Sequence, residues 1–326
     1  MIRGPGLAKV WFSSLLPGLV LLSLLGVFLP GAARWSRRVG TAARTVVVYT
    51  SQDEVYAEPI FREFEAATGI KVRAVFDSEA VKTVGLANRL LAERTHPQCD
   101  VFWNNEEFRT RELAARGAFR PTNGWAALGY RSRRIVVNTN LVSAGRAPHS
   151  FLDATNAQWR GRVALAYPLF GTTATHFLAL RQKLGDAGWQ TWCRALAANR
   201  PFLVDGNSVV VKMVGAGEAI WGFTDSDDIE EGRHDGLPVA AVAVGEETLL
   251  LSNTVGVVRD APHPEAADAL YTYLRTPQLA RRLVAAHALE SDQPPGGGSP
   301  GLRVDWDGLL RDTEVATAAL RGIFLR

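Results

Sequence analysis

The chain has 326 residues, of which 47% are hydrophobic and 21% are charged, a composition typical of a globular protein. This length suits two lobes, each with its own core, and is short for three. The formal net charge is +3, and no basic stripe interleaved with aromatic residues appears, so we expect no nucleic-acid partner.

The N-terminal segment predicts export. Two basic residues precede an uncharged, mostly apolar run, and the small residues that signal peptidase prefers follow, with candidate cleavage at Ala33 or Ala43. We predict a Sec-type signal peptide in residues 1–44 and a periplasmic or cell-surface protein. The alternative is an uncleaved membrane anchor formed by residues 10–30, because about twenty apolar residues just span a bilayer.

From Thr45 onward, strands alternate with helices. Short β-branched runs predict strands, and apolar residues at three- and four-residue spacing predict amphipathic helices. The strands cover about 45–49, 70–75 and 100–103, and the helices about 54–68, 77–94 and 105–117. Three such units in a row imply a parallel sheet with helices on its faces.

A second α/β run follows an extended strand at 135–138. The predicted strands are 163–166, 219–223, 239–244 and 249–258, and the predicted helices are 171–184, 189–198 and 264–288. A flexible Pro/Gly-rich linker at 294–300 precedes a terminal helix from Trp306.

This pattern predicts an α/β protein of two lobes, each a mainly parallel sheet flanked by helices, joined by a hinge. Residues 45–137 with about 252–290 form the first lobe and 138–251 the second; residues 291–326 are the linker and C-terminal helix. Cys99 and Cys193 fall in different lobes and lack metal-site spacing, so we expect two separate thiols.

Several segments, taken in order, resemble the periplasmic substrate-binding proteins of ABC importers, and most of all their ferric-iron-binding branch. The matching segments are Val47–Glu54, Phe64–Val72, Gln98–Trp103, Trp159–Val163 and Gly171–Thr173. The resemblance covers about Val46 to Leu289. It implies a type 2 periplasmic-binding fold, capture of a solute between two lobes and delivery to a membrane permease.

The resemblance is incomplete at the metal ligands. Where the ferric branch has a histidine in the first turn, this chain has Asp53, and where it has a glutamate after the third strand, this chain has Asn104 and Asn105. Its pair of adjacent tyrosines is replaced by Thr224 and Asp225. A different solute, or a carboxylate-rich metal site, therefore stays open.

Ligands of open α/β sheets bind beyond the carboxyl ends of the strands, and polar turns lie at these ends. The predicted ligand-binding residues are Thr50, Ser51, Gln52, Asp53, Ser78, Asn104, Asn105, Gly171, Thr172, Thr173, Asn207, Thr224 and Asp225.

Two opposite kinds of chemistry are present in this set. Gly171 to Thr173 open a helix, whose unpaired N–H groups and dipole suit an anion; plain N-capping by Thr172 is the alternative, as it is for Asn207. Asp53 and Asp225 are candidate metal ligands, because hard cations prefer oxygen; each is also placed to cap a helix. Asp227 and Asp228 extend the acidic turn, and Trp103 or Trp221 would favour an ammonium group by cation–π attraction.

The sequence lacks HExxH, Walker and GxSxG signatures, so we predict a binding protein and not an enzyme. Iron(III), or another metal with a synergistic anion as cargo, is the leading solute class, and no resident cofactor is expected. Phosphonates, phosphate esters and organic cations such as polyamines or thiamine are alternatives. A membrane-tethered sensor module and a hydrolase using the acidic turn as a metal site are further hypotheses. We expect a monomer that docks on an ABC permease.

Overall fold

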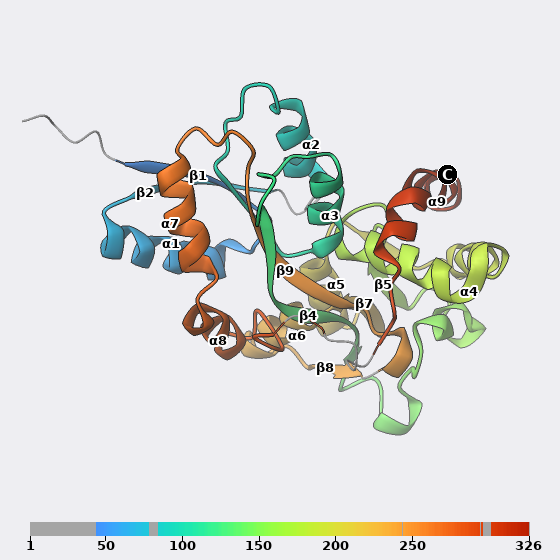
Figure 1. Ribbon diagram of the computed structural model, residues 1–326. Coiled ribbons are helices and arrows are strands. Elements are labelled where there is room, and N and C mark those ends of the chain that lie inside the picture. The colour runs from blue at the N-terminus through green and yellow to red at the C-terminus, as the bar shows by residue number, and fades with distance from the viewer. Residues whose placement is uncertain (1–43, 78–83, 243, 294, 296–300, 326) are drawn as a thin grey trace, which may run out of the picture. The chain divides into compact units, whose positions relative to one another are not determined.

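The computed structural model describes residues 44–77, 84–242, 244–293, 295 and 301–325 (Figure 1). The signal or anchor segment, its cleavage sites, Ser78 and most of the predicted linker lie outside the described residues. Residues from Ala42 to the C-terminus form one compact unit, to which the following description applies.

The first half of the sheet confirms the three predicted strand–helix units. The strands run parallel, with the first between the other two. They are β1 (Thr45–Thr50), β2 (Lys71–Phe76) and β3 (Val101–Asn104), followed by the helices α1 (Glu54–Thr68), α2 (Val84–Ala92) and α3 (Glu107–Ala115). Helix α1 ends where the sequence indicated, because Gly69 adopts the left-handed conformation (φ 70°) that glycine tolerates at a helix end.

The second half of the sheet contains another parallel set. β5 (Val163–Ala166) lies between β6 (Phe202–Val204) and β7 (Trp221–Asp225), and β6 is a strand that the sequence did not predict. The helices that follow these strands are α4 (Gly171–Ala198), α5 (Asn207–Gly215) and α6 (Ser226–His234). β8 (Val239–Val242) pairs with β4.

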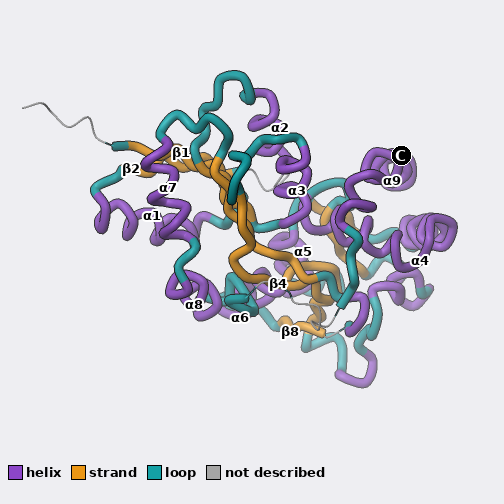
Figure 2. The backbone as a smooth tube through the Cα atoms, in the orientation of Figure 1, coloured by secondary structure: helices purple, strands orange, loops and turns teal. Residues whose placement is uncertain are grey.

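Two long antiparallel strands connect the halves. β4 (Trp125–Asn138) and β9 (Leu250–Val257) lie at the centre of the order β2-β1-β3-β9-β4-β7-β5-β6. β4 begins ten residues earlier than the predicted strand at 135–138. Figure 2 shows the strands as a continuous band with helices on both sides.

The remaining helical stretches are interrupted at two places, one of which the sequence did not predict. The helical stretch predicted at 264–288 is two helices, α7 (Pro264–Leu274) and α8 (Pro277–Ala285), because Thr276 caps the second. The two helices predicted at 171–184 and 189–198 are the two parts of α4, which Gly185 separates with a non-helical conformation (φ 68°). Helix α9 (Trp306–Phe324) closes the chain as predicted, and short 3-10 turns lie at Ala144–Arg146, Phe151–Thr155, Ala157–Trp159 and Gly245–Glu247.

Separate hydrophobic clusters fill the two halves. The largest joins α4, β7 and the terminal helix, to which α9 contributes Leu320 and Phe324. Cys99 and Cys193 are free and buried in different clusters, as expected. Within the described residues, no helix has both the length and the apolar character needed to cross a membrane.

Candidate functional site

A polar pocket lies among the turns that end the strands. Its empty volume, which includes the solvent space at its opening, is about 480 Å³. The lining residues come from the turns after β1, β3, β5, β6 and β7, and from β4: Asp53, Asn105, Arg131, Ala166, Tyr167, Phe170, Gly171, Thr172, Thr173, Asp205, Gly206, Asn207, Asp225, Asp227 and Asp228.

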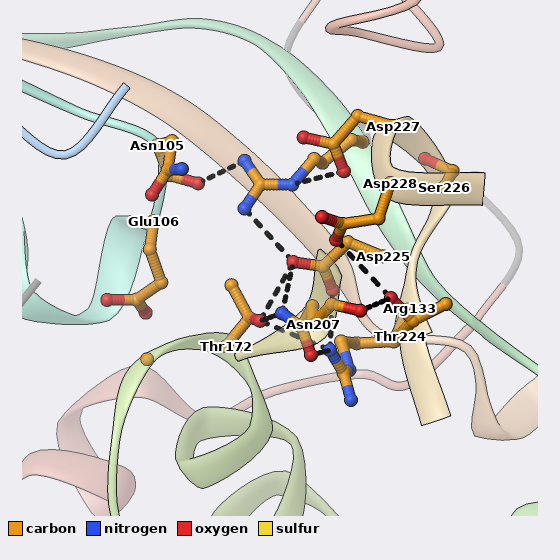
Figure 3. A network of polar contacts seen from close by, with 12 residues as sticks. Asn105, Glu106, Arg133, Thr172, Asn207, Thr224, Asp225, Ser226, Asp227 and Asp228 are labelled. Carbon is orange, nitrogen blue, oxygen red and sulfur yellow. Dashed lines mark hydrogen bonds and ion pairs between the residues drawn. The ribbon is translucent and has the colours of Figure 1, made fainter. Parts of the chain in front are cut away.

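Asp225 is the centre of the polar network in this pocket (Figure 3). Its carboxylate is buried and accepts hydrogen bonds from Arg133 Nη1 at 2.7 Å and Arg131 Nη2 at 3.1 Å. Burial alone would raise the pKa of Asp225, but the charges of Arg133 and Arg131, with hydrogen bonds from Arg133 and Thr172, hold that pKa below its usual value. Asp225 is therefore an ionised carboxylate with two cationic partners. The interpretation of Asp225 as a capping side chain is wrong, because it makes no capping hydrogen bond to α6.

The side chains expected to receive an anion already face this carboxylate. Thr172 Oγ1 donates to Asp225 Oδ2 at 2.8 Å, and Asn207 Nδ2 donates to the same oxygen at 3.2 Å. Thr173 Oγ1 donates to Asn207 Oδ1 at 3.4 Å. Neither Thr172 nor Asn207 is an N-cap, since Phe170 and Gly206 hold those positions without a side-chain cap. What α4 offers to an anion is therefore the backbone of its first turn, which lines the pocket.

Arg131 joins the two halves of the sheet at the pocket. Its Nη1 donates to the Asn105 carbonyl at 2.6 Å, and its Nε lies 3.1 Å from Asp227 Oδ1. Together with the Asp225 bond, these contacts fix a buried guanidinium between the β3–α3 turn and the start of α6.

Carboxylates dominate the remaining surface of the pocket. Oxygens of Asp225, Asp227 and Asp228 lie within 4.8 Å of one another, and Thr224 Oγ1 donates to Asp228 at 3.3 Å. Burial, followed by the charges of Asp227, Glu231, Asp53 and Asp228, raises the pKa of the Tyr56 phenol on α1. This phenol therefore stays protonated near neutral pH.

The other predicted residues of the first half lie behind the lining. Ser51 Oγ donates to Asn105 Oδ1 at 3.0 Å and also bonds Asn104, while Asn253 Nδ2 donates to Gln52 Oε1 at 2.6 Å. Thr50, Ser51, Gln52 and Asn104 are buried and do not line the pocket, and the same is true of Thr224 on β7 in the second half. Trp103 and Trp221 are also fully buried, so neither can supply the cation–π contact that we considered.

The sequence analysis overlooked the two arginines that organise the site. Arg131 and Arg133 are two residues apart on β4, so both point to the same face of the strand. That spacing was the available signal. Tyr167 and Phe170, which follow β5, and the exposed Asp205 also line the pocket without having been predicted.

A buried histidine lies one helical turn beyond Thr172. His176 is fully buried, and its Nε2 donates to the Glu247 carbonyl at 2.9 Å, since a carbonyl can only accept. Burial, followed by the charge of Arg133, lowers the pKa of His176 to about 3. The imidazole is therefore neutral in the folded protein at neutral pH.

This histidine makes stability depend on pH. The unfolded chain gains a proton at His176 below about pH 6.5 whereas the folded protein does not, so unfolding should become easier by about 2 kcal/mol between pH 7 and pH 5. Urea denaturation at both pH values should show this loss in the wild type and not in His176→Gln. His234→Gln, at an exposed position, should keep it. An equal loss in His176→Gln would contradict the assignment.

Two α/β halves joined by long strands, with a polar pocket at the strand ends, define the class of two-lobed binding proteins of the periplasmic type. The chain belongs to the bacterial extracellular solute-binding protein family, whose model matches residues 45–287. This finding confirms the resemblance seen in the sequence.

Several known proteins are similar to the chain. It is 29% identical over 199 residues to the Fe(3+)-binding periplasmic protein of Serratia marcescens, a match that covers 56% of each chain. The chain thus spans little more than half the length of this curated relative. Among solved structures, iron-bound HitA from Pseudomonas aeruginosa has a TM-score of 0.72 at 18% identity, and the match covers 86% of this chain and 99% of HitA. AfuA from Actinobacillus pleuropneumoniae, with fructose-6-phosphate bound, has the same TM-score at 16% identity and coverages of 86% and 98%. These structures share the fold, whereas their bound ligands, iron and fructose-6-phosphate, differ.

Proposed function

We propose that this protein captures a cation, with ferric iron and a companion anion as the leading cargo, and delivers it to an ABC importer. The observation that carries the proposal is the charge of the pocket. Of the described residues that line it, five are aspartates and one is an arginine, and Arg133 lies behind them. Five carboxylates against two guanidinium groups leave an excess of three formal negative charges. Such a pocket attracts a cation or a cationic group.

Two of the carboxylates already pair with arginine. Asp225 is held between Arg131 and Arg133, and Asp227 pairs with Arg131, so a metal at either side chain would compete with a guanidinium group. Together with Asp53 and Asp228, these side chains are the hard oxygen ligands that a trivalent or divalent cation prefers. The first-turn N–H groups of α4 suit the companion anion. The ferric-binding relative from Serratia supports iron as the cation.

The second candidate is an organic solute with an amine and a phosphate or phosphonate group. Arg131 and Arg133 already balance the negative charge of Asp225. The residues that line the pocket include no pair of adjacent tyrosines. A zwitterion would place its amine against the carboxylates of the acidic turn and its anionic group at the first turn of α4.

The remaining parts of the proposal concern location and partners. The relatives are periplasmic by name, and we propose that residues 1–44 are a Sec-type signal or an anchor. We propose two lobes, residues 45–137 with about 252–290 and residues 138–251, that close over the cargo as a monomer and dock on the permease. The binding proteins among the relatives support a role without catalysis.

A thermal-shift screen of residues 42–326 tests the function. A cargo at about 100 times its Kd should stabilise the protein by about 2.7 kcal/mol. Ferric ion with citrate or phosphate should raise the Tm if iron is the cargo, and a phosphonate, polyamine or thiamine should raise it if the second candidate holds. A screen without any shift would refute capture of these solutes.

Asp228→Asn should lower the affinity for ferric ion at least about tenfold, the lower end of the effect of losing a residue that merely supports a metal ligand. Isothermal titration with the ferric–phosphate mixture measures this change. Glu230→Gln is the matched control, since Glu230 lies on the same helix, pairs with Arg233 and does not line the pocket. Equal affinities for Asp228→Asn and wild type would remove Asp228 from the site.

A further inference from the structure

The turn between β3 and α3 makes a direct contact with α4. Glu106 is fully buried and caps α3, accepting hydrogen bonds from the backbone N–H of Phe108 at 2.7 Å and of Arg109 at 3.0 Å. The Oε1 atom of Glu106, which accepts the hydrogen bond from Phe108, also accepts one from Thr175 Oγ1 at 3.0 Å. The carboxylate of Glu106 thus serves its own helix and a side chain from a distant part of the chain at once.

The two partners belong to different halves of the sheet. Glu106 follows β3, which pairs with β1 and β9, whereas Thr175 lies on the helix after β5, which pairs with β6 and β7. Phe108, two residues after Glu106, is buried in the cluster that contains Phe177 and Phe223 of the second half. The start of α3 therefore packs on the second half, and the Glu106–Thr175 bond is the polar part of this contact.

This contact adjoins the pocket on both sides. Asn105 lines the pocket, and its carbonyl accepts from Arg131, which pairs with Asp225 and Asp227. On α4, Thr172 and Thr175 are three residues apart and share a face of the helix. Separation of the two halves at this turn would thus break the Glu106–Thr175 bond and would part Arg131 from either Asn105 or Asp225.

The burial of Glu106 is consistent with a contact that depends on closure. Burial raises the pKa of Glu106 even though Arg109 and the helix N–H groups act to lower it, so the carboxylate is held away from water. Thr175 also lies 3.4 Å from the Gly171 carbonyl, a bond within α4 that would survive opening. Helix α4 therefore does not need Glu106 to keep its own shape.

We propose that the Glu106–Thr175 hydrogen bond is a latch that holds the two halves closed over the cargo, and that Thr175 is a positioning residue for cargo retention. The retention part rests on the proposed function, because it requires a cargo in the pocket. The closure part does not, since the bond is present in the protein alone.

Thr175→Val tests the latch, because it removes the hydroxyl and keeps the shape of the side chain. Small-angle X-ray scattering of the cargo-free protein should give a larger radius of gyration for Thr175→Val than for wild type. Dissociation of ferric ion in phosphate, followed by stopped flow with a chelator, should be about fivefold faster, the change expected for loss of one buried hydrogen bond. Thr175→Ser keeps the hydroxyl and should restore both values.

Thr110→Val is a matched control, because Thr110 is equally buried and bonds Thr254 at 2.7 Å within the first half. It should leave the radius of gyration unchanged. An unchanged radius in Thr175→Val, or the same change in Thr175→Ser, would overturn the latch. If no variant binds ferric ion, the proposed cargo is wrong, while the scattering comparison still decides whether the latch exists.

Discussion

Asp225→Asn is expected to lower the free energy of unfolding by about 3–5 kcal/mol, the usual cost of removing one partner from a buried ion pair. The substitution keeps the size of the side chain and removes the charge that compensates two buried guanidinium groups, Arg131 and Arg133. Chemical denaturation at neutral pH measures the change. The same variant should also bind cargo more weakly, because its side-chain amide would keep one acceptor oxygen in place of the two that Arg131, Arg133, Thr172 and Asn207 share.

Asp205→Asn is the matched control for this loss of stability. Asp205 lines the same pocket but is exposed, so its neutralisation should change stability by no more than about 0.5 kcal/mol. The dependence of stability on acidic pH provides a second check. Because the pKa of Asp225 is lowered in the folded protein, its contribution is present above about pH 4 and is lost as the pH falls through the folded value. Asp225→Asn should lack this part of the acid sensitivity, and a wild-type-like stability in the variant would show that the two arginines do not depend on Asp225.

Local signals explain why the first half of the sheet was predictable. β1 is a β-branched run, α1 carries apolar residues at helical spacing, and Gly69 ends that helix in the left-handed conformation. Each of these features acts within a few residues of the chain. The strand–helix order that they define was sufficient to predict the fold class, which the family match confirms.

β4 shows where local signals fail. Its first ten residues include Gly129 and three arginines, and the sequence predicted no strand there. Its pairing with β9 joins positions more than a hundred residues apart. Gly129 has φ 147° at a register shift, and a side chain there would meet the Ser291 carbonyl. Only the distant partner strand makes this segment extended.

The position of the polar pocket followed from the sequence, whereas its ion pairs did not, and the role of the predicted residues in binding stays a prediction. The polar turns were expected at the strand ends, and seven of the thirteen predicted residues line the pocket: Asp53, Asn105, Gly171, Thr172, Thr173, Asn207 and Asp225. An aspartate before a helix predicts a cap, but Asp225 instead bonds Arg131 and Arg133, which lie 94 and 92 residues away. The local sequence places Arg131 and Arg133 on one face of a strand, but it does not identify the distant carboxylate with which they pair.

Phe177→Ala should also cost about 3–5 kcal/mol, the usual loss for truncating a buried phenylalanine. Phe177 is fully buried and contacts Trp192 at a ring-centroid distance of 5.1 Å, Phe324 at 6.0 Å and Phe223 at 6.5 Å. One ring thus ties the first part of α4 to the part beyond Gly185, to the terminal helix and to β7. Truncation leaves a cavity at the point where these elements meet, and denaturant unfolding measures the loss.

Phe202→Ala separates this effect from a general sensitivity to aromatic truncation, because Phe202 is 37% exposed on β6 and should cost less than about 1 kcal/mol. The comparison bears on the site, since the first part of α4 carries Thr172 and Thr173 at one end and Phe177 further along. A full loss in Phe177→Ala would mean that the aromatic cluster sets the position of the helix and that Asp225 bonds a helix already in place. A loss below about 1 kcal/mol would mean that the bonds to Asp225 and Arg133 hold α4, so that pocket and core are stabilised by the same polar network.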